Sequence, residues 1–254
     1  MTKAVIIGSG NVAWSLAHYL PFCSCCVMQI VSRTQESAQS LASTIGADFT
    51  TDFSKIYANA DFYIYAITDD ALNTVITQVN VKNGLHLHTS GSVDMDVFRG
   101  KQYDFGVLYP FQTFSKQKKV DLNNVPFFIE ANSSDNQHKL MDFAKKISLK
   151  VYEISFEQRK KVHLAGVFGN NFTNFLWGIS YKFLKECNLP FSVILPLITE
   201  SVDKLKYLTP NQAQTGPAAR GDQKSIAEHL KFLHNNKDLE EIYALLTENI
   251  KRGS

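Results

Sequence analysis

The stretch AVIIGSGNVAWSLAHYL, residues 4–20, decides the fold of this chain. Apolar residues lead into the pattern Gly8-Ser9-Gly10-Asn11-Val12-Ala13, and helical spacing follows over residues 11–20, before Pro21. In a strand–turn–helix unit, the first glycine permits a tight turn, the second lets backbone N–H groups approach a pyrophosphate, and the alanine lets the helix pack closely on the strand. The helix N-terminus adds unpaired N–H donors and a positive dipole end. We therefore expect Gly8, Ser9, Gly10, Asn11 and Val12 to bind a dinucleotide; the alternative is a glycine turn without a ligand.

Strands and helices alternate through the first half of the chain. The predicted strands are residues 3–7, 27–31, 61–67 and 85–88. A predicted helix at 37–45, with Gly46 as its C-cap, lies between the second and third strands, and one at 71–79 lies between the third and fourth. This order indicates a parallel sheet with right-handed crossovers, in which ligands bind at the carboxyl ends of the strands. Small polar residues stand at three such ends: Gly8-Ser9-Gly10, Thr68-Asp69-Asp70 and Thr89-Ser90-Gly91. We therefore expect Ile67, Thr68, Asp69 and Thr89 to complete the dinucleotide site.

The end of the second strand indicates which dinucleotide binds. An NAD site usually has Asp or Glu about twenty residues beyond the glycines, to hold the ribose hydroxyls. This chain has Ser32-Arg33-Thr34 there, two hydroxyls and a guanidinium that suit a 2′-phosphate. The alternative is that Arg33 is a solvated surface residue. We predict NADP as the cofactor.

The second half of the chain becomes mixed and then helical. Residues 105–109, 125–130 and 150–154 are predicted strands, residues 135–147 are a predicted helix, and the chain is helical from Glu157 almost to its end. We therefore predict an α/β fold, with an N-terminal Rossmann domain built on a parallel sheet over residues 1–154. An all-helical domain for dimerisation and substrate binding follows over residues 155–254.

The predicted long helix, residues 157–185, carries polar side chains in an unusual setting. Residues 164–181 contain no charge, but their several amides would be costly in lipid, so we expect burial between subunits or domains and no membrane span. His163, Asn170 and Asn171 share one face of this helix. Their partners are either other helices, in a structural network, or a substrate in a cleft between domains.

The loop Thr215-Gly216-Pro217-Ala218-Ala219-Arg220-Gly221-Asp222 carries a further candidate. The guanidinium of Arg220 suits bidentate binding of a carboxylate. The alternative is an ion pair between Arg220 and Asp222 or another acid. Asp222 is also the predicted N-cap of the helix that follows.

Composition excludes several classes of partner. The formal net charge of +2 over 254 residues gives no electrostatic reason to expect nucleic acid or an acidic membrane surface. The basic run Arg159-Lys160-Lys161 is expected to lie on a solvated face. The four cysteines lack zinc-type spacing, so we predict reduced thiols, no metal site and a cytoplasmic location.

Several motifs together resemble one protein family. They are the glycine motif, His88-Thr89-Ser90-Gly91, Pro110-Phe111-Gln112-Thr113-Phe114, His163 with Asn170-Asn171-Phe172, and the loop of residues 215–222. The resemblance is to bacterial proteins with a Rossmann-like domain and an uncharacterised helical C-terminal domain, often labelled deazaflavin-coenzyme-dependent NADP oxidoreductases. Their architecture is similar to that of pyrroline-5-carboxylate, ketopantoate and hydroxyacid reductases. The resemblance implies a homodimer through the helical domain, which closes the substrate cleft.

One position departs from that family. Tyr109 precedes Pro110 where many relatives have His, so we assign no general acid there. The related hydroxyacid dehydrogenases place Lys and Asn on the helix where this chain has His163 and Asn171.

These observations predict an NADPH-dependent reductase of a small carbonyl or imine compound that bears a carboxylate, such as ketopantoate. We assign His163, Asn171 and Ser90 to catalysis, with His163 as the donor of a proton or a hydrogen bond, and Asn170 and Arg220 to substrate binding. Two alternatives remain: a module that senses NADP(H) redox state without turnover, and a deazaflavin-dependent NADP reductase.

Overall fold

The computed structural model describes residues 1–253, which form two compact units. The first unit is Met1–Phe175, and the second begins at Leu176. The domain boundary predicted after residue 154 falls just before a helix within the first unit, and as a boundary it stays a prediction.

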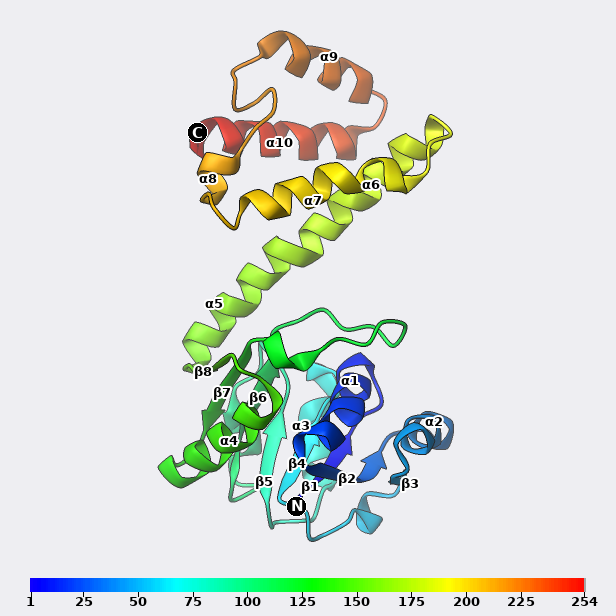
Figure 1. Cartoon of the computed structure of the whole chain (residues 1–254), viewed down its shortest axis with the longest axis vertical. Coiled ribbons are helices and arrows are strands. Elements are labelled where there is room, and N and C mark those ends of the chain that lie inside the picture. Colours follow the sequence, from blue (N-terminus) through cyan, green and yellow to red (C-terminus); the bar gives the residue numbers. More distant parts are fainter. Residues whose placement is uncertain (254) are drawn as a thin grey trace. The chain divides into compact units, whose positions relative to one another are not determined.

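The first unit is built on an eight-stranded sheet in the order β3-β2-β1-β4-β5-β6-β7-β8 (Figure 1). Neighbouring strands are parallel except β6 and β7, which run antiparallel. The strands are β1 (Thr2–Ile7), β2 (Cys25–Val31), β3 (Asp48–Thr50), β4 (Phe62–Tyr65), β5 (Leu85–His88), β6 (Phe105–Pro110), β7 (Phe127–Ala131) and β8 (Val151–Glu153). The chain leaves β1 toward β2 on one side and returns to β4 on the other, so a crevice opens at the carboxyl end of β1.

Helices connect these strands and cover both faces of the sheet. They are α1 (Asn11–Tyr19), α2 (Gln35–Ile45), α3 (Asp69–Gln78) and α4 (Ser134–Ile147), with short 3-10 turns η1 (Leu20–Cys23), η2 (Phe53–Lys55), η3 (Met95–Phe98) and η4 (Leu122–Asn124). In β1, alternate residues enter two hydrophobic cores: Ala4 and Ile6 pack with α1, α2 and α4, whereas Val5 and Ile7 pack with α3 and η3. The predicted Rossmann sheet followed by helices is confirmed, while β3 was not predicted because Phe49 is its one apolar residue and gives no apolar run.

The predicted long helix is interrupted by a turn of a different kind. Ser155 begins α5 (Phe156–Gly166) with a capping box, and α6 (Thr173–Glu186) is the next α-helix along the chain. Between them η5 (Val167–Phe172) is a π-helical turn. The expected burial of this helix is not seen within the chain, because no residue of α6 is buried and Phe172 and Phe175 are at least half exposed.

The second unit consists of the rest of α6 and the helices that follow it. They are η6 (Phe191–Val193), α7 (Leu195–Lys204), α8 (Pro210–Ala213), α9 (Gln223–Leu233) and α10 (Lys237–Gly253). Asp222 accepts a hydrogen bond from the Ser225 N–H and caps α9, as predicted. No helix in residues 1–253 has the length and apolar character needed to cross a membrane.

Candidate active site

The first cavity lies at the carboxyl ends of β1, β2 and β4 and measures about 820 Å³. Its lining includes every residue predicted to bind the cofactor except Thr34 and Asp69. Those in the lining are Gly8, Ser9, Gly10, Asn11, Val12, Ser32, Arg33, Ile67, Thr68 and Thr89. The crevice at the topological switch point is therefore where the glycine motif and the strand-end loops meet.

The backbone around the glycines fits a pyrophosphate. Gly8 has a φ of +123°, and a Cβ there would collide with the carbonyl oxygen of Ala66, so only glycine suits this turn. A Cβ on Gly10 would meet no atom within 4 Å, which leaves open space beside the start of α1. Gly10 also offers no side-chain cap to α1, so the first-turn N–H groups remain free for an anion.

A chain of hydroxyls links the glycine loop to the end of β2. Ser9 Oγ lies 2.8 Å from Ser32 Oγ, Ser32 Oγ lies 3.0 Å from Ser37 Oγ, and Ser37 Oγ lies 2.6 Å from Thr34 Oγ1. Thr34 also caps α2, and it is not among the residues that line the cavity. No acidic residue is among the described residues that line the cavity, and Arg33 is exposed at its edge. The hydroxyls and the Arg33 guanidinium fit a 2′-phosphate. Ser37 was not predicted to belong to this group because it is the first residue of the predicted helix, residues 37–45.

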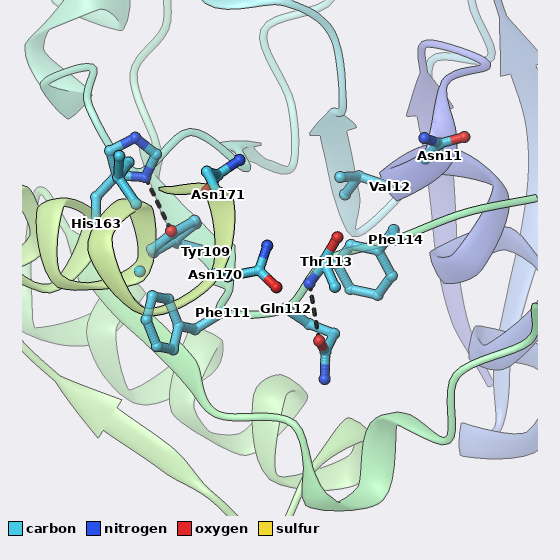
Figure 2. Close-up of a pocket in the computed structure, with 12 residues that line it drawn as sticks. Asn11, Val12, Tyr109, Phe111, Gln112, Thr113, Phe114, His163, Asn170 and Asn171 are labelled. Atoms are coloured by element: carbon cyan, nitrogen blue, oxygen red, sulfur yellow. Dashed lines mark hydrogen bonds between the residues drawn. The ribbon is translucent and has the colours of Figure 1, made fainter. Parts of the chain in front are cut away.

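A second cavity of about 400 Å³ adjoins the first within the same unit (Figure 2). Asn11 and Val12 line both cavities, so the two meet at the start of α1. The rest of the lining comes from two segments, the end of β6 with the chain after it and the α5–η5 helix: Tyr109, Phe111, Gln112, Thr113, Phe114, His163, Gly166, Val167, Asn170 and Asn171. The structure thus brings His163, Asn170 and Asn171 together beside the predicted cofactor site.

Tyr109 is a site residue that the sequence analysis did not assign. Its Oη lies 3.1 Å from Nδ1 of His163, and the two rings meet edge to face (Figure 2). Burial raises the pKa of Tyr109 to about 12, so its phenol keeps its proton at physiological pH. The signal available in the sequence was the position of Tyr109 at the carboxyl end of a strand.

Ser90 and Asp69 lie near the cavities without lining either of them. The Ser90 hydroxyl accepts hydrogen bonds from the N–H groups of Ser92 and Val93, at 3.1 Å each, and so stabilises its own loop. Asp69 accepts a hydrogen bond from the Ser92 hydroxyl. The catalytic role of Ser90 and the cofactor role of Asp69 stay predictions.

The prediction that Arg159 lies on a solvated face is wrong. Arg159 is fully buried, and its guanidinium donates to Glu130 on β7 at 2.6 Å and to the carbonyl of Val93 at 2.7 Å. The basic run misled because Arg159 is one helical turn before His163, on the face of α5 that packs against the sheet. Lys160 is exposed and pairs with Glu157, as a solvated face requires.

Arg220 belongs to the second unit and lies in the exposed turn between α8 and α9. No ion pair joins it to Asp222 in the part of the chain that the structure describes. Its role as a carboxylate ligand stays a prediction.

Comparisons with known proteins agree with this geometry. Residues 3–87 match the family described as "NADP oxidoreductase coenzyme F420-dependent", and residues 125–250 match a domain of unknown function, DUF2520. No curated protein sequence matches the chain. A "putative NADP oxidoreductase" from Bacteroides fragilis is 41% identical over 99% of this chain and 98% of its own, with a TM-score of 0.94.

Two more distant structures share the fold. A pyrroline-5-carboxylate reductase from Streptococcus pyogenes is 14% identical, with a TM-score of 0.68 and 98% of each chain covered. An imine reductase from Myxococcus stipitatus, solved with NADP⁺, is 12% identical, with a TM-score of 0.66 over 99% of this chain and 95% of its own.

The fold and the first cavity define a dinucleotide-dependent oxidoreductase with a Rossmann domain and a helical C-terminal region. Within that class, the chain belongs to the NADP oxidoreductase family, and NADP is its cofactor.

Proposed function

We propose that this protein reduces a small carbonyl or imine compound that bears a carboxylate. The observation that carries the proposal is the junction of the two cavities at Asn11 and Val12, which gives the cofactor site direct access to His163, Asn170 and Asn171. NADPH, when bound, supplies a hydride to the substrate carbon. His163 donates a proton or a hydrogen bond to the oxygen or nitrogen that gains charge, and the two amides orient the substrate.

The second cavity suits a small, partly apolar substrate. Its volume lies at the lower end of the usual range for small-molecule sites, roughly 300–1,000 Å³. Phe111 and Phe114 supply apolar surface, while Gln112, Asn170 and Asn171 supply amides. No Lys or Arg is among its described lining residues, and the assignment of the substrate carboxylate to Arg220 or Ser90 rests on the sequence alone. Reductases of cyclic imines share this fold, which supports an imine or carbonyl as the reacting group.

We also propose that the helical region forms a homodimer. In residues 176–253, Ile226 and Leu233 are the buried hydrophobic residues, which is a small core for a unit of that size. Large apolar side chains on α6 and α7 are exposed, among them Tyr181, Leu195, Leu197 and Val202. A second copy of the same chain covers these faces.

The four free cysteines support the predicted cytoplasmic location.

The test is NADPH consumption by the purified protein with pairs of compounds that differ in one carboxylate. The panel holds 2-oxo acids such as ketopantoate and cyclic imino acids such as pyrroline-5-carboxylate, each with its analogue lacking the carboxylate. We expect turnover that prefers the acids, and Arg220→Ala should raise KM for the acid alone. Equal turnover of both members of a pair would remove the carboxylate from the proposal. NADPH binding without turnover would favour a redox sensor. Hydride transfer only between a reduced deazaflavin and NADP⁺ would favour a deazaflavin-dependent NADP reductase.

A further inference from the structure

We propose that Tyr109 is a positioning residue that fixes the tautomer and orientation of His163, so that Nε2–H of His163 donates a hydrogen bond to the reacting group. This inference rests on the proposed function, because it gives His163 the role of a donor to the substrate. It adds a residue to which the sequence analysis assigned no role. Three features of the structure support this role: the hydrogen bond, the packing around it and the attachment of α5 to the sheet.

The hydrogen bond joins Tyr109 Oη and His163 Nδ1 at 3.1 Å. The phenol is protonated at physiological pH, and Nδ1 of His163 is the one hydrogen-bond partner of Tyr109 Oη within residues 1–253. A phenol that donates to Nδ1 requires this nitrogen to be an acceptor. In a neutral imidazole the proton then lies on Nε2, which has no hydrogen-bond partner in the described chain and is free for a ligand.

The packing around this bond leaves it little freedom. A Cβ added to Gly91 would lie 2.6 Å from His163 Nδ1 and 2.7 Å from Tyr109 Cζ, so the Gly91 backbone closes one side of the pair. The Tyr109 ring also contacts the rings of Phe111 and Phe128, with centroids 6.1 and 6.2 Å away. These contacts hold the phenol where it meets His163.

The attachment of α5 places His163 at the same point. Arg159, one turn earlier on α5, donates to the carbonyl of Val93, two residues beyond Gly91. On the other side of His163, a Cβ on Gly166 would lie 2.6 Å from Phe111, so the helix also approaches the chain after β6 closely. The imidazole is thus held from the helix and from the sheet, as expected for a preorganised donor.

The experiment is nitrogen NMR of the full-length protein labelled with [15N]histidine, at a pH where imidazole is neutral. The His163→Ala spectrum assigns the signals. We expect wild type to show a single His163 tautomer with the proton on Nε2, and Tyr109→Phe to show a mixture that includes the Nδ1–H form. Tyr103→Phe, at an exposed tyrosine, should leave the wild-type pattern unchanged. A proton on Nδ1 in wild type, or an unchanged tautomer in Tyr109→Phe, would overturn the inference.

Kinetics give a second readout. Tyr109→Phe should lower kcat about 10-fold, which corresponds to about 1.4 kcal/mol, and leave KM for NADPH unchanged. An equal loss in Tyr103→Phe, or a change confined to KM, would also contradict the inference. Because the NMR measurement needs no substrate, its result stands apart from the proposed function. If the tautomer is confirmed while His163→Ala retains full turnover, the proposed function fails and the tautomer assignment holds.

Discussion

At the scale of single residues, Gly91 matters because its missing side chain leaves room for the Tyr109–His163 pair. It keeps the loop after β5 in contact with both Tyr109 and His163, at distances that no Cβ tolerates. The sequence showed this glycine only as one of several small residues at a strand end. Its steric role depends on α5, more than sixty positions further along the chain, and spacing within the loop carries no information about that contact.

Gly91→Ala should therefore separate the Tyr109–His163 pair. We expect kcat to fall at least 10-fold while the Kd for NADPH changes little, because the cofactor-binding glycines are untouched. Steady-state kinetics and a fluorescence titration with NADPH measure the two quantities. Gly178→Ala is the control, since a Cβ at Gly178 meets no atom within 4 Å. Full activity of Gly91→Ala would show that the close packing at this position is irrelevant to catalysis.

We expect Arg33 to make the protein bind NADPH more tightly than NADH. It is exposed at the edge of the first cavity, next to a chain of hydroxyls and without an acidic neighbour in the lining. Loss of a charge-assisted hydrogen bond costs about 1.5–3 kcal/mol, so Arg33→Ala should weaken NADPH binding roughly 10- to 100-fold and leave NADH binding unchanged. Calorimetric titration with both cofactors measures this, with Lys55→Ala as a control for general charge. Equal losses for the two cofactors would place the 2′-phosphate elsewhere.

At the scale of elements, the α5–η5 helix accounts for most of the difference between the predicted and the observed site. Its apolar and polar spacing correctly placed His163, Asn170 and Asn171 on one face. The π turn at η5 was not predicted, since hydrogen bonds from residue i to i+5 leave no signature in the order of side chains. Such turns recur at functional sites, and here the turn carries two of the three asparagines that line the second cavity, Asn170 and Asn171.

Local pattern was sufficient for the glycine loop, α1, α2 and β5, because each combines a clear period with a turn or cap residue at its end. It was insufficient for Arg159. A basic residue in a basic run is ordinarily solvated, and only the tertiary fold brings Glu130 and the Val93 carbonyl to meet this one. Tyr109 escaped for the same reason, since its partner His163 comes from a distant helix.

Arg159→Leu tests how α5 is held to the sheet. The substitution leaves Glu130 without its buried partner and Val93 without its donor, so we expect a loss of about 3 kcal/mol in the free energy of unfolding. Urea denaturation followed by circular dichroism measures it. Lys160→Leu removes an exposed pair with Glu157 and should cost less than about 1 kcal/mol. Similar effects of the two substitutions would mean that the buried pair does not anchor α5.

At the scale of the whole molecule, the exposed apolar surface of the helical region is the main feature to explain. Leu197 on α7 is 65% exposed, and the unit to which it belongs has few buried hydrophobic residues. We expect Leu197→Arg to shift the protein from dimer to monomer, as measured by light scattering after gel filtration. Phe22→Arg replaces a side chain that is more exposed still, in η1 of the first unit, and should leave the dimer intact. A monomeric wild type would contradict the proposed assembly.

Two buried histidines of β5 should make the fold sensitive to acid. Burial lowers the pKa of His86 to about 4 and that of His88 to about 3, from the ordinary value of 6.5. Below pH 6.5 the unfolded chain therefore binds protons that the folded chain refuses. Stability is fully present above that pH and falls as the pH decreases toward 4 and then 3.

Thermal unfolding between pH 7 and pH 4 measures this dependence. We expect the slope of Tm against pH to be shallower in His88→Gln than in wild type, because one of the two proton-binding sites is gone. The exposed His138 provides the control substitution, His138→Gln. An unchanged slope in His88→Gln would assign the acid sensitivity to other groups.

We expect one continuous site to combine an NADPH cleft with His163 as the donor to the reacting group. The most direct measurement is kcat for NADPH oxidation by wild type, His163→Ala and His138→Ala, at saturating cofactor and carbonyl or imine substrate. We expect wild type and His138→Ala to turn over alike and His163→Ala to be slower by about 10²-fold or more. Equal turnover in His163→Ala, or binding of NADPH with no turnover of either substrate class, would contradict it.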